Sequence, residues 1–597
     1  MIAFSENTQM TCRYLSLTAS AFALIAGMGI STQQAHAQAY NRVAPRALDT
    51  ERPALANEPH VTRNLLPDSD REVARGLRGI AIVAPGAEGG VPDGIFVGEG
   101  VDGILRNQAF TDAMKTRLGK PLTTSDINAV VDTIYKVYRR AGRPYVFVSI
   151  PAQKISAGYL KIIVDEYSLN HVSVEGNRWF STPDLIQIAG LGAGQKMTLG
   201  RQQEALDRLN SNPFRSAAAV ASPGGERGQS DVTLKVTDHL PVRGYAGYDT
   251  GGTPILGRQE WFVGGAVGNL PLDGVLSYQF THAVSERYSA HAINYSMTLP
   301  WHDRIQVFGD YAWERPEISL GTIAGTPIKM TEKGHSGQAS FRYLHDFRPF
   351  FVGDVLIRQQ ISGGFDFKTT NNSIEFGGVN VYAGNADVAQ FPISYLIDET
   401  DKWGRTTFRN TLTFSPGGLT GGNGKKAMDV IVPGAKSGYV YDTMSLSRLT
   451  YLPLGMSWSM DAVGQVASSN LMYSNQIGLG GLYTTRGYFT SSAYGSQGVT
   501  VQNELHSPAW NLFKGWDTEQ VGVFVDYGHV SQVKRIPQGV NGLDLASVGL
   551  DAKLKIRDYL DVSFNVGWRL KGMPDERRNE GYGDKGAFGN VAVTVGF

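Results

Sequence analysis

Acidic and nucleophilic side chains are plentiful in this sequence, but one short run alone has the spacing of a known catalytic motif. Asp249-Thr250-Gly251 matches the triplet of aspartic proteases. That chemistry needs two carboxylates that share one proton, so a chain with one copy would have to dimerise. The triplet also ends a glycine-rich stretch and precedes Gly252 and Pro254, a composition that predicts a hairpin turn. We therefore interpret Asp249 as a turn residue.

Sequence patterns for acyl transfer, phosphate binding and metal binding are missing. The chain has no G-x-S-x-G elbow, no Walker-type phosphate loop and no H-E-x-x-H pair, and its 11 histidines are scattered. The one cysteine, Cys12, lies in a segment that we expect to be removed, so the mature chain has no thiol for a disulfide or a metal. We expect no enzyme activity, no metal site and no cofactor.

The N-terminal residues predict a secretory signal peptide over residues 1–37. A mostly apolar stretch at 14–30 follows Arg13 and precedes Ala35-His36-Ala37, which has the pattern of an A-x-A cleavage site. A single membrane anchor is the alternative, but polar residues interrupt the stretch. It falls short of the roughly 20 apolar residues that a spanning helix needs.

The composition favours a membrane β-barrel and argues against a nucleic-acid partner. The 55 basic and 55 acidic residues cancel, whereas nucleic-acid binding depends on basic clusters. The chain is rich in glycine, with 71 residues, and 10% of it is aromatic. Short alternating segments in a secreted chain of this kind are typical of a barrel, because alternate residues of each strand face lipid.

Two consecutive segments share one order of elements: strand, helix, helix, strand, strand. They follow residues 38–76, a flexible segment with a candidate short plug helix at 68–77. The first copy is residues 77–167, with strands at 77–83, 145–150 and 160–164 and helices at 104–118 and 126–140. A loop is expected at 85–94, and the pairing partner of the long segment 85–100 is left open. The second copy is residues 168–240, with strands at 171–174, 215–221 and 231–237 and helices at 182–189 and 201–209. This duplicated α+β order is the organisation of POTRA domains.

The remaining residues, 241–597, show strand and turn signals and no convincing helical period. At roughly 10 residues per strand plus connections, this length predicts an antiparallel transmembrane β-barrel of about 16 strands. A soluble sandwich or propeller is the alternative, but no blade-like repeat is visible. The last strand, VAVTVGF, alternates valine with small or polar residues and ends in Phe597, which we expect to act as the C-terminal assembly signal.

The run VGVFVDYGHV predicts which way Asp526 faces. Val521, Val523 and Val525 share one face of this strand with Tyr527, and Phe524 and Asp526 share the other. A charge that faces lipid costs several kcal/mol near the middle of the membrane, about 2–4 for a basic residue and less for an acidic one. Asp526 is therefore expected to face the lumen.

Over residues 77–597 the sequence resembles the ShlB/FhaC/HecB transporters of two-partner secretion, relatives of the BamA insertases. The resemblance rests on short motifs in the POTRA-like copies and in the barrel: GRP at 142–144, IPAQ at 150–153, GYL at 158–160, VEGN at 174–177, NPFR at 212–215, PGG at 223–225 and LPW at 299–301. The most specific motif is GGLYTTRGY at 480–488, which is similar to the V-R-G-Y/F signature of a loop that folds into the lumen. Thr485 stands where valine or isoleucine is usual in the family.

The resemblance implies a set of functional residues. The secretion motif on the infolded loop would be Arg486, Gly487 and Tyr488, and its partner on the inner wall would be the F-x-D motif of Phe524 and Asp526. In the POTRA copies we expect contacts with the transported protein at Tyr145, Phe147, Pro151, Gln153, Asn212, Phe214 and Arg215.

The implied function is secretion across the outer membrane of a Gram-negative bacterium, with the N-terminal domains in the periplasm. The partner would be a large β-helical exoprotein such as a haemolysin, adhesin or contact-inhibition toxin. The barrel-assembly machinery would insert the chain, which we expect to be monomeric. The alternatives are an assembly factor of BamA or TamA type, which carries five or three POTRA units where two are counted here, a passive porin, and more remotely a soluble adhesin or enzyme.

Overall fold

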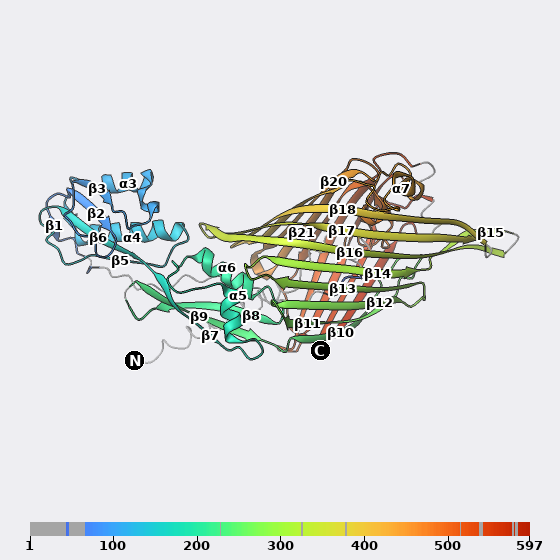
Figure 1. Cartoon of the computed structure of the whole chain (residues 1–597), viewed down its shortest axis with the longest axis horizontal. Helices are drawn as coiled ribbons and strands as arrows, with labels where there is room; N and C mark the ends of the chain where they lie inside the picture. Colours follow the sequence, from blue (N-terminus) through green and yellow to red (C-terminus); the bar gives the residue numbers. More distant parts are fainter. Residues whose placement is uncertain are drawn as a thin grey trace. The chain divides into compact units, whose positions relative to one another are not determined.

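The computed structural model describes residues 43–46, 66–67, 69–226, 228–323, 326–376, 379–513, 515–536, 541–575, 578 and 583–596. These fall into two compact units (Figure 1). One comprises the described residues within Met1–Glu51, Leu240–Phe347 and Gln359–Phe597, and the other comprises those within Arg52–His239 and Arg348–Arg358. The predicted signal peptide and Phe597 lie outside the described residues. Among the described residues, no helix has the length and apolar character needed to cross a membrane.

The first α+β domain is a four-stranded sheet with two helices. The sheet order is β3-β2-β6-β5, made of β3 (Gly94–Val97), β2 (Gly79–Val83), β6 (Tyr159–Glu166) and β5 (Val146–Ser149). Helices α3 (Gln108–Lys115) and α4 (Thr124–Arg140) contribute Phe110 and Ile134 to a core shared with Ile80 and Leu160 of the sheet. Apolar residues recur along one face of each helix, which is why both pack on this core.

Three details of this domain differ from the sequence prediction. The helix expected at 104–118 is broken into η1 (Gly103–Arg106) and α3, because Asn107 caps α3 by accepting the Phe110 N–H at 2.8 Å. Strand β3, whose first residue fell within the expected loop, pairs in parallel with β2 and so settles the open pairing. The short plug helix at 68–77 is wrong, since β1 (Glu72–Ala74) pairs there with β4 (Leu122–Thr123).

The second α+β domain shares the strand, helix, helix, strand, strand order of the first, whose sheet also contains β3. Strands β7 (Ser168–Glu175), β9 (Gln229–Asp238) and β8 (Arg215–Pro223) form a sheet in the order β7-β9-β8, with helices α5 (Thr182–Ala189) and α6 (Leu199–Leu209). In the first domain β2 pairs in parallel with β6, and β5 pairs antiparallel with β6. In the second domain β7 pairs in parallel with β9, and β8 pairs antiparallel with β9. The duplicated order predicted from the sequence is therefore confirmed.

The larger unit is a closed antiparallel β-barrel. Strand β15 continues β14, since both pair with β16, so the described strands occupy 16 positions around the barrel. Strands β10 and β28 close it, with Tyr248 opposite Val593. In Figure 1 the strands run side by side, and β15 lies at their far end. The barrel strands are β10 (Val242–Asp249), β11 (Glu260–Leu270), β12 (Gly274–Ala283), β13 (Tyr288–Thr298), β14 (Arg304–Glu314), β15 (Glu317–Ile323), β16 (Thr326–Val352), β17 (Val355–Phe376), β18 (Val379–Asp401), β19 (Gly404–Ser415), β20 (Tyr439–Tyr451), β21 (Ser457–Ala467), β24 (Gln497–His506), β25 (Asp517–Ser531), β26 (Gly542–Ile556), β27 (Leu560–Arg569) and β28 (Ala587–Gly596).

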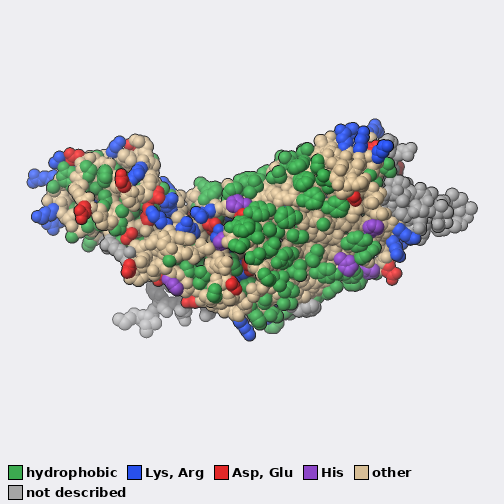
Figure 2. All heavy atoms as spheres, viewed as in Figure 1, with side chains coloured by type: hydrophobic (Ala, Val, Ile, Leu, Met, Phe, Trp, Pro, Cys, Tyr) green, Lys and Arg blue, Asp and Glu red, His purple; other side chains and the backbone are tan. Residues whose placement is uncertain are grey.

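The barrel strands separate apolar and polar residues between their two faces. On β25, Val523 and Val525 are 49% and 55% exposed on the outside, whereas Phe524 and Asp526 are buried on the inside. Hydrophobic side chains gather over the visible barrel wall in Figure 2. This is the pattern of a wall that meets lipid outside and a polar lumen inside. One short helix, α7 (Lys425–Ile431), lies between β19 and β20, where the sequence had predicted none.

Helix α4 offers a test of the first α+β domain. Its N-cap Thr123 forms a capping box, in which the Asp126 carboxylate accepts the Thr123 N–H and the Thr123 hydroxyl oxygen accepts the Asp126 N–H. The hydrogen bond from the Thr123 hydroxyl helps to hold the pKa of Asp126 below its usual value. Thr123→Ala should destabilise the helix by about 1 kcal/mol, which speeds hydrogen exchange of α4 amides about fivefold.

The same capping box predicts a pH dependence. Because the pKa of Asp126 is lower in the folded state than in the unfolded state, its stabilisation is complete above about pH 4 and is lost as the pH falls further. The exchange rate of the α4 amides, divided by their intrinsic rate at each pH, reports how often the helix opens. As the pH falls below about 4, this ratio should increase more for the wild type than for Asp126→Asn. Equal increases in the two proteins would contradict the assignment.

Candidate functional site

The segment between β21 and β24, residues 468–496, folds into the barrel and is called the lumen loop below. It contains the short strands β22 (Ile477–Leu479) and β23 (Ala493–Gly495), which pair with each other. Leu479 and Tyr488 are fully buried and belong to one cluster with the inward-facing Val530 and Leu545 of β25 and β26. The loop is therefore packed against the inner wall.

Arg486 of the lumen loop meets Asp526 of the wall through three hydrogen bonds. Its Nε and backbone N–H donate to Oδ2 at 2.8 and 2.9 Å, and its Nη2 donates to Oδ1 at 2.7 Å. Its Nη1 also donates to Glu504 on β24. The guanidinium lies 3.8 Å from the centre of the Phe524 ring, a cation–π contact. Both charged side chains are almost completely buried, at 5% and 0% exposure.

Two close contacts at glycine residues allow the loop to reach this position. Gly487 has φ of 86° and lies against Gly567 of β27, and a Cβ on Gly487 would lie 2.9 Å from the Gly567 carbonyl carbon. The Phe524 ring covers Gly549 of β26, where a Cβ would lie 2.2 Å from the ring. A Cβ would not fit at Gly487, Gly549 or Gly567, and Gly487 also has a positive φ. Glycine is therefore required at all three positions.

Tyr488 attaches the loop to the wall through its hydroxyl group. The hydroxyl oxygen lies 2.9 Å from the Ala546 carbonyl and 2.6 Å from the Lys571 carbonyl, and it accepts the Lys571 N–H at 3.2 Å. Arg569 supports the same turn, since its Nε donates to the Gly487 carbonyl at 2.7 Å. The structure thus brings together Arg486, Gly487, Tyr488, Phe524 and Asp526, the five residues that the resemblance assigned to the loop motif and its partner on the wall.

Sequence reasoning missed the residues that surround this pair. Glu504 and Arg569 stand on strands where only alternation could have suggested that they face the lumen. A second attachment of the lumen loop was also missed: Lys368 of β17 donates from Nζ to Asn475 Oδ1 at 2.7 Å, and Asn475 Nδ2 donates to Gln390 at 2.9 Å. Lys368 and Asn475 are buried, so this attachment also lies inside the barrel.

Residues 43–46 also lie inside the barrel. Val43 is buried in a cluster with Leu256 and Tyr288. Arg46 Nη2 donates to Asp249 Oδ2 at 2.7 Å and Nη1 donates to the hydroxyl of Tyr483 in the lumen loop at 3.2 Å. Asp249 thus belongs to an ion pair and is the last residue of β10, so the expected turn begins one residue later, at Thr250.

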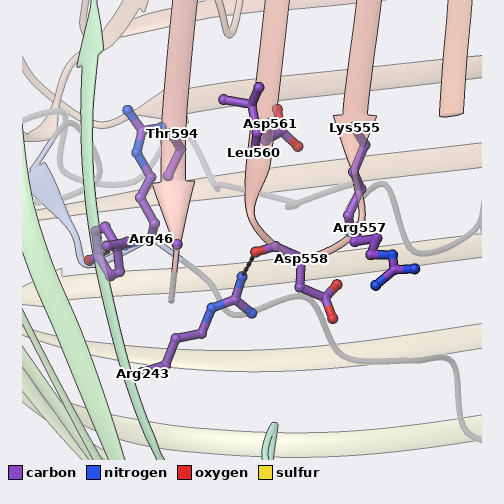
Figure 3. A pocket seen from close by; sticks show the side chains of 10 residues that line it. Arg46, Arg243, Lys555, Arg557, Asp558, Leu560, Asp561 and Thr594 are labelled. Carbon is purple, nitrogen blue, oxygen red and sulfur yellow. Dashed lines mark hydrogen bonds between the residues drawn. The ribbon is translucent and has the colours of Figure 1, made fainter. Parts of the chain in front are cut away.

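A small hollow lies beside Arg46 at one end of the barrel. It is bounded by Arg46, by the closing strands β10 and β28, and by the turn between β26 and β27. Arg243 donates from Nη2 to the Asp558 carbonyl at 2.8 Å across it. Figure 3 shows the side chains that surround the hollow, among them Arg46, Arg243, Lys555, Arg557, Asp558 and Asp561.

The residues expected to contact a transported protein are mostly internal. Tyr145, Asn212, Phe214 and Arg215 are buried, with exposures between 1% and 4%, so they offer no surface to a partner in this structure. They have structural contacts instead: the Tyr145 hydroxyl donates to Gln202, Asn212 Oδ1 accepts the Phe214 N–H at 3.1 Å, and Arg215 Nε donates to the Leu209 carbonyl at 2.6 Å.

Three expected contact residues remain partly accessible. Phe147, Pro151 and Gln153 are half-buried. The side chain of Gln153 pairs with the backbone of Lys161, accepting its N–H and donating to its carbonyl at 2.7 Å each. Gln153 thereby covers the edge of β6 beyond the end of β5.

Comparison with known proteins agrees with this architecture. Residues 228–554 match the family model of the haemolysin secretion/activation protein ShlB/FhaC/HecB, and residues 99–166 match that of the POTRA domain, ShlB-type. The chain is 22% identical to the outer membrane transporter CdiB of Dickeya dadantii (strain 3937), over 74% of this chain and 76% of that protein. It is 23% identical to the heme/hemopexin transporter protein HuxB of Haemophilus influenzae, over 76% of this chain and 78% of that protein.

Solved structures show the same fold. CdiB from Escherichia coli aligns with a TM-score of 0.71 at 18% identity, covering 89% of this chain and 93% of CdiB. CdiB from Acinetobacter baumannii aligns with a TM-score of 0.62 at 15% identity, covering 100% of both chains. Because the family model spans more than half of the sequence, the chain belongs to the ShlB/FhaC/HecB haemolysin secretion/activation family, outer-membrane transporters of two-partner secretion whose POTRA domains lie in the periplasm.

Proposed function

We propose that this transporter captures an unfolded exoprotein with its POTRA domains and passes it through the barrel after the lumen loop has left its position. The observation that carries this proposal is the buried contact of Arg486 with Asp526 and Glu504. This contact holds the lumen loop in the path that an extended chain would take through the barrel. We assign residues 77–167 and 168–240 to the POTRA domains, and residues 241–597 to the barrel.

Sheet edges supply the capture surface in this proposal. Strands β3 and β5 are the edges of the first sheet, and β7 and β8 are the edges of the second. An extended chain can add to such an edge through backbone hydrogen bonds, which do not demand one particular sequence. Gln153 already occupies part of the β6 edge, so capture in the first domain would use the open side of β5 or β3.

The client proposed from these features is a large β-helical exoprotein, such as a haemolysin, an adhesin or a contact-inhibition toxin. The family model that matches the chain is described as a haemolysin secretion/activation protein, which supports a protein cargo of this class. The sequence contains no Walker-type nucleotide motif. Folding of the client outside the cell would then drive export. The barrel-assembly machinery would insert the chain as a monomer.

Arg486→Ala tests the position of the lumen loop. The variant leaves Asp526 buried without its partner, which should cost about 3–5 kcal/mol of local stability. We expect secretion of the partner to fall at least tenfold, while the barrel still shifts on heating in a denaturing gel. Arg486→Lys should also fail, because a lysine cannot bind both oxygens of Asp526 as the guanidinium fork does.

Arg448→Ala is the matched control. Arg448 also lies on the barrel and forms an ion pair, with Asp401 at 3.1 Å, but its contacts lie outside the lumen loop. Secretion by this variant should stay within about twofold of the wild type, since partly exposed pairs contribute roughly 0–1 kcal/mol. Wild-type secretion by Arg486→Ala would refute the role given to the lumen loop.

Removal of residues 77–240 separates a transporter from a passive porin. We expect the truncated chain to form a pore in planar bilayers whose conductance no longer responds to the partner's secretion domain, whereas the full chain responds. If the truncated chain still binds that domain, the POTRA domains are not the capture site. Loss of the gene should spare the assembly of other outer-membrane proteins, and a general assembly defect would favour the insertase alternative.

A further inference from the structure

A second cluster of ionisable side chains lies beside the Arg486 pair, on the lumen face of the same wall. It consists of Glu504 and His506 of β24 and Asp551 of β26. His506 is opposite Gly522 of β25, and Gly522 is opposite Asp551. His506, Gly522 and Asp551 therefore form one row across three neighbouring strands. The central glycine has no side chain, and His506 and Asp551 meet over it.

The donor atoms of the cluster converge. His506 Nε2 lies 3.1 Å from Glu504 Oε2 and 3.3 Å from Asp551 Oδ2, and one ligand atom from each residue falls within 4.8 Å of the others. In a tetrahedral site with metal–ligand bonds of about 2.0–2.1 Å, neighbouring ligand atoms are about 3.3 Å apart. The separations around Nε2 are close to that value.

The same atoms lack hydrogen-bond partners. Within the part of the chain that the structure describes, neither carboxylate oxygen of Asp551 nor His506 Nε2 has a partner with hydrogen-bond geometry. His506 and Asp551 are 5% and 6% exposed. A buried carboxylate with no donor is strongly unfavourable, so Asp551 needs a positively charged partner, and its Oδ2 lies on the side of His506 Nε2.

The surrounding charges leave this part of the lumen negative. Asp461 and Asp526 add two carboxylates to those of Glu504 and Asp551. Arg486 and Lys553 are the permanent cations that act most strongly on Glu504. Carboxylates therefore outnumber permanent cations around Glu504, which favours a bound cation.

We propose that Glu504, His506 and Asp551 bind one divalent transition-metal ion, with zinc as the best match. One imidazole and two carboxylates are a ligand set that Zn²⁺ accepts, with water in the fourth position. Glu504 binds the ion through Oε2, while its Oε1 accepts from Arg486. The ion therefore strengthens the wall against which the lumen loop is held.

Metal binding by the purified, untagged mature protein in detergent tests this proposal. After chelator treatment and dialysis, titration with Zn²⁺ should give one tightly bound equivalent, and Co²⁺ should give the visible spectrum of a four-coordinate ion with nitrogen and oxygen ligands. His506→Gln and Asp551→Asn should each weaken Zn²⁺ binding by more than about 100-fold, beyond the 10–100-fold typical of outer-shell changes. Heat modifiability in gels shows which variants are folded.

Two further variants make the outcome decisive. A Cβ on Gly522 would lie 2.4 Å from Asp551 Oδ1 and 2.7 Å from His506 Cδ2, so Gly522→Ala should also weaken binding without removing a ligand. His529 is the matched control, since it too is near a carboxylate, 2.8 Å from Asp544, but is partly exposed; His529→Ala should bind like the wild type. No stoichiometric ion in the wild type, or equal affinity in His506→Gln, would overturn the proposal and leave a protonated His506 between two carboxylates.

Discussion

The interaction on which the lumen depends is the fork formed by Arg486 with Asp526 and Glu504. A guanidinium and two carboxylates are costly to bury unless each is paired with good geometry, and three hydrogen bonds to Asp526 meet that requirement. The position of the guanidinium in turn constrains the residues around it. The Phe524 ring must lie next to the guanidinium, Gly549 must leave room for that ring, and Gly487 must approach Gly567 closely. Residues on five separate segments are thus fixed by one buried charge.

Much of the fold could be predicted from sequence because its signals are local. Helix α4 and the strands of the second POTRA domain follow from apolar periodicity, and β25 follows from the valines that occupy alternate positions 521, 523 and 525. The inward direction of Asp526 followed from the cost of a charge in lipid. The break at Asn107 and the strand β1 were missed, since each depends on a hydrogen bond to the backbone that competes with the helical pattern.

The surroundings of the site were harder to predict. Glu504 and His506 are two residues apart, the spacing that places both side chains on one face of a strand, and this signal could have been used. Asp551 joins them only through the register of β24, β25 and β26, which no short motif records. For the NPFR motif the sequence suggested a surface contact where the structure shows an internal one. Asn212, Phe214 and Arg215 were expected to face a partner, but they are buried and stabilise the turn into β8.

Arg46 has a consequence for the order in which the lumen can be cleared. One guanidinium joins a segment near the N-terminus to Tyr483 of the lumen loop and to Asp249 of the wall. Two occupants that share a contact are coupled thermodynamically, and such coupling is reciprocal. Withdrawal of either one lowers the free energy needed to withdraw the other by the same amount. A signal that reaches only the N-terminal segment therefore also loosens the loop.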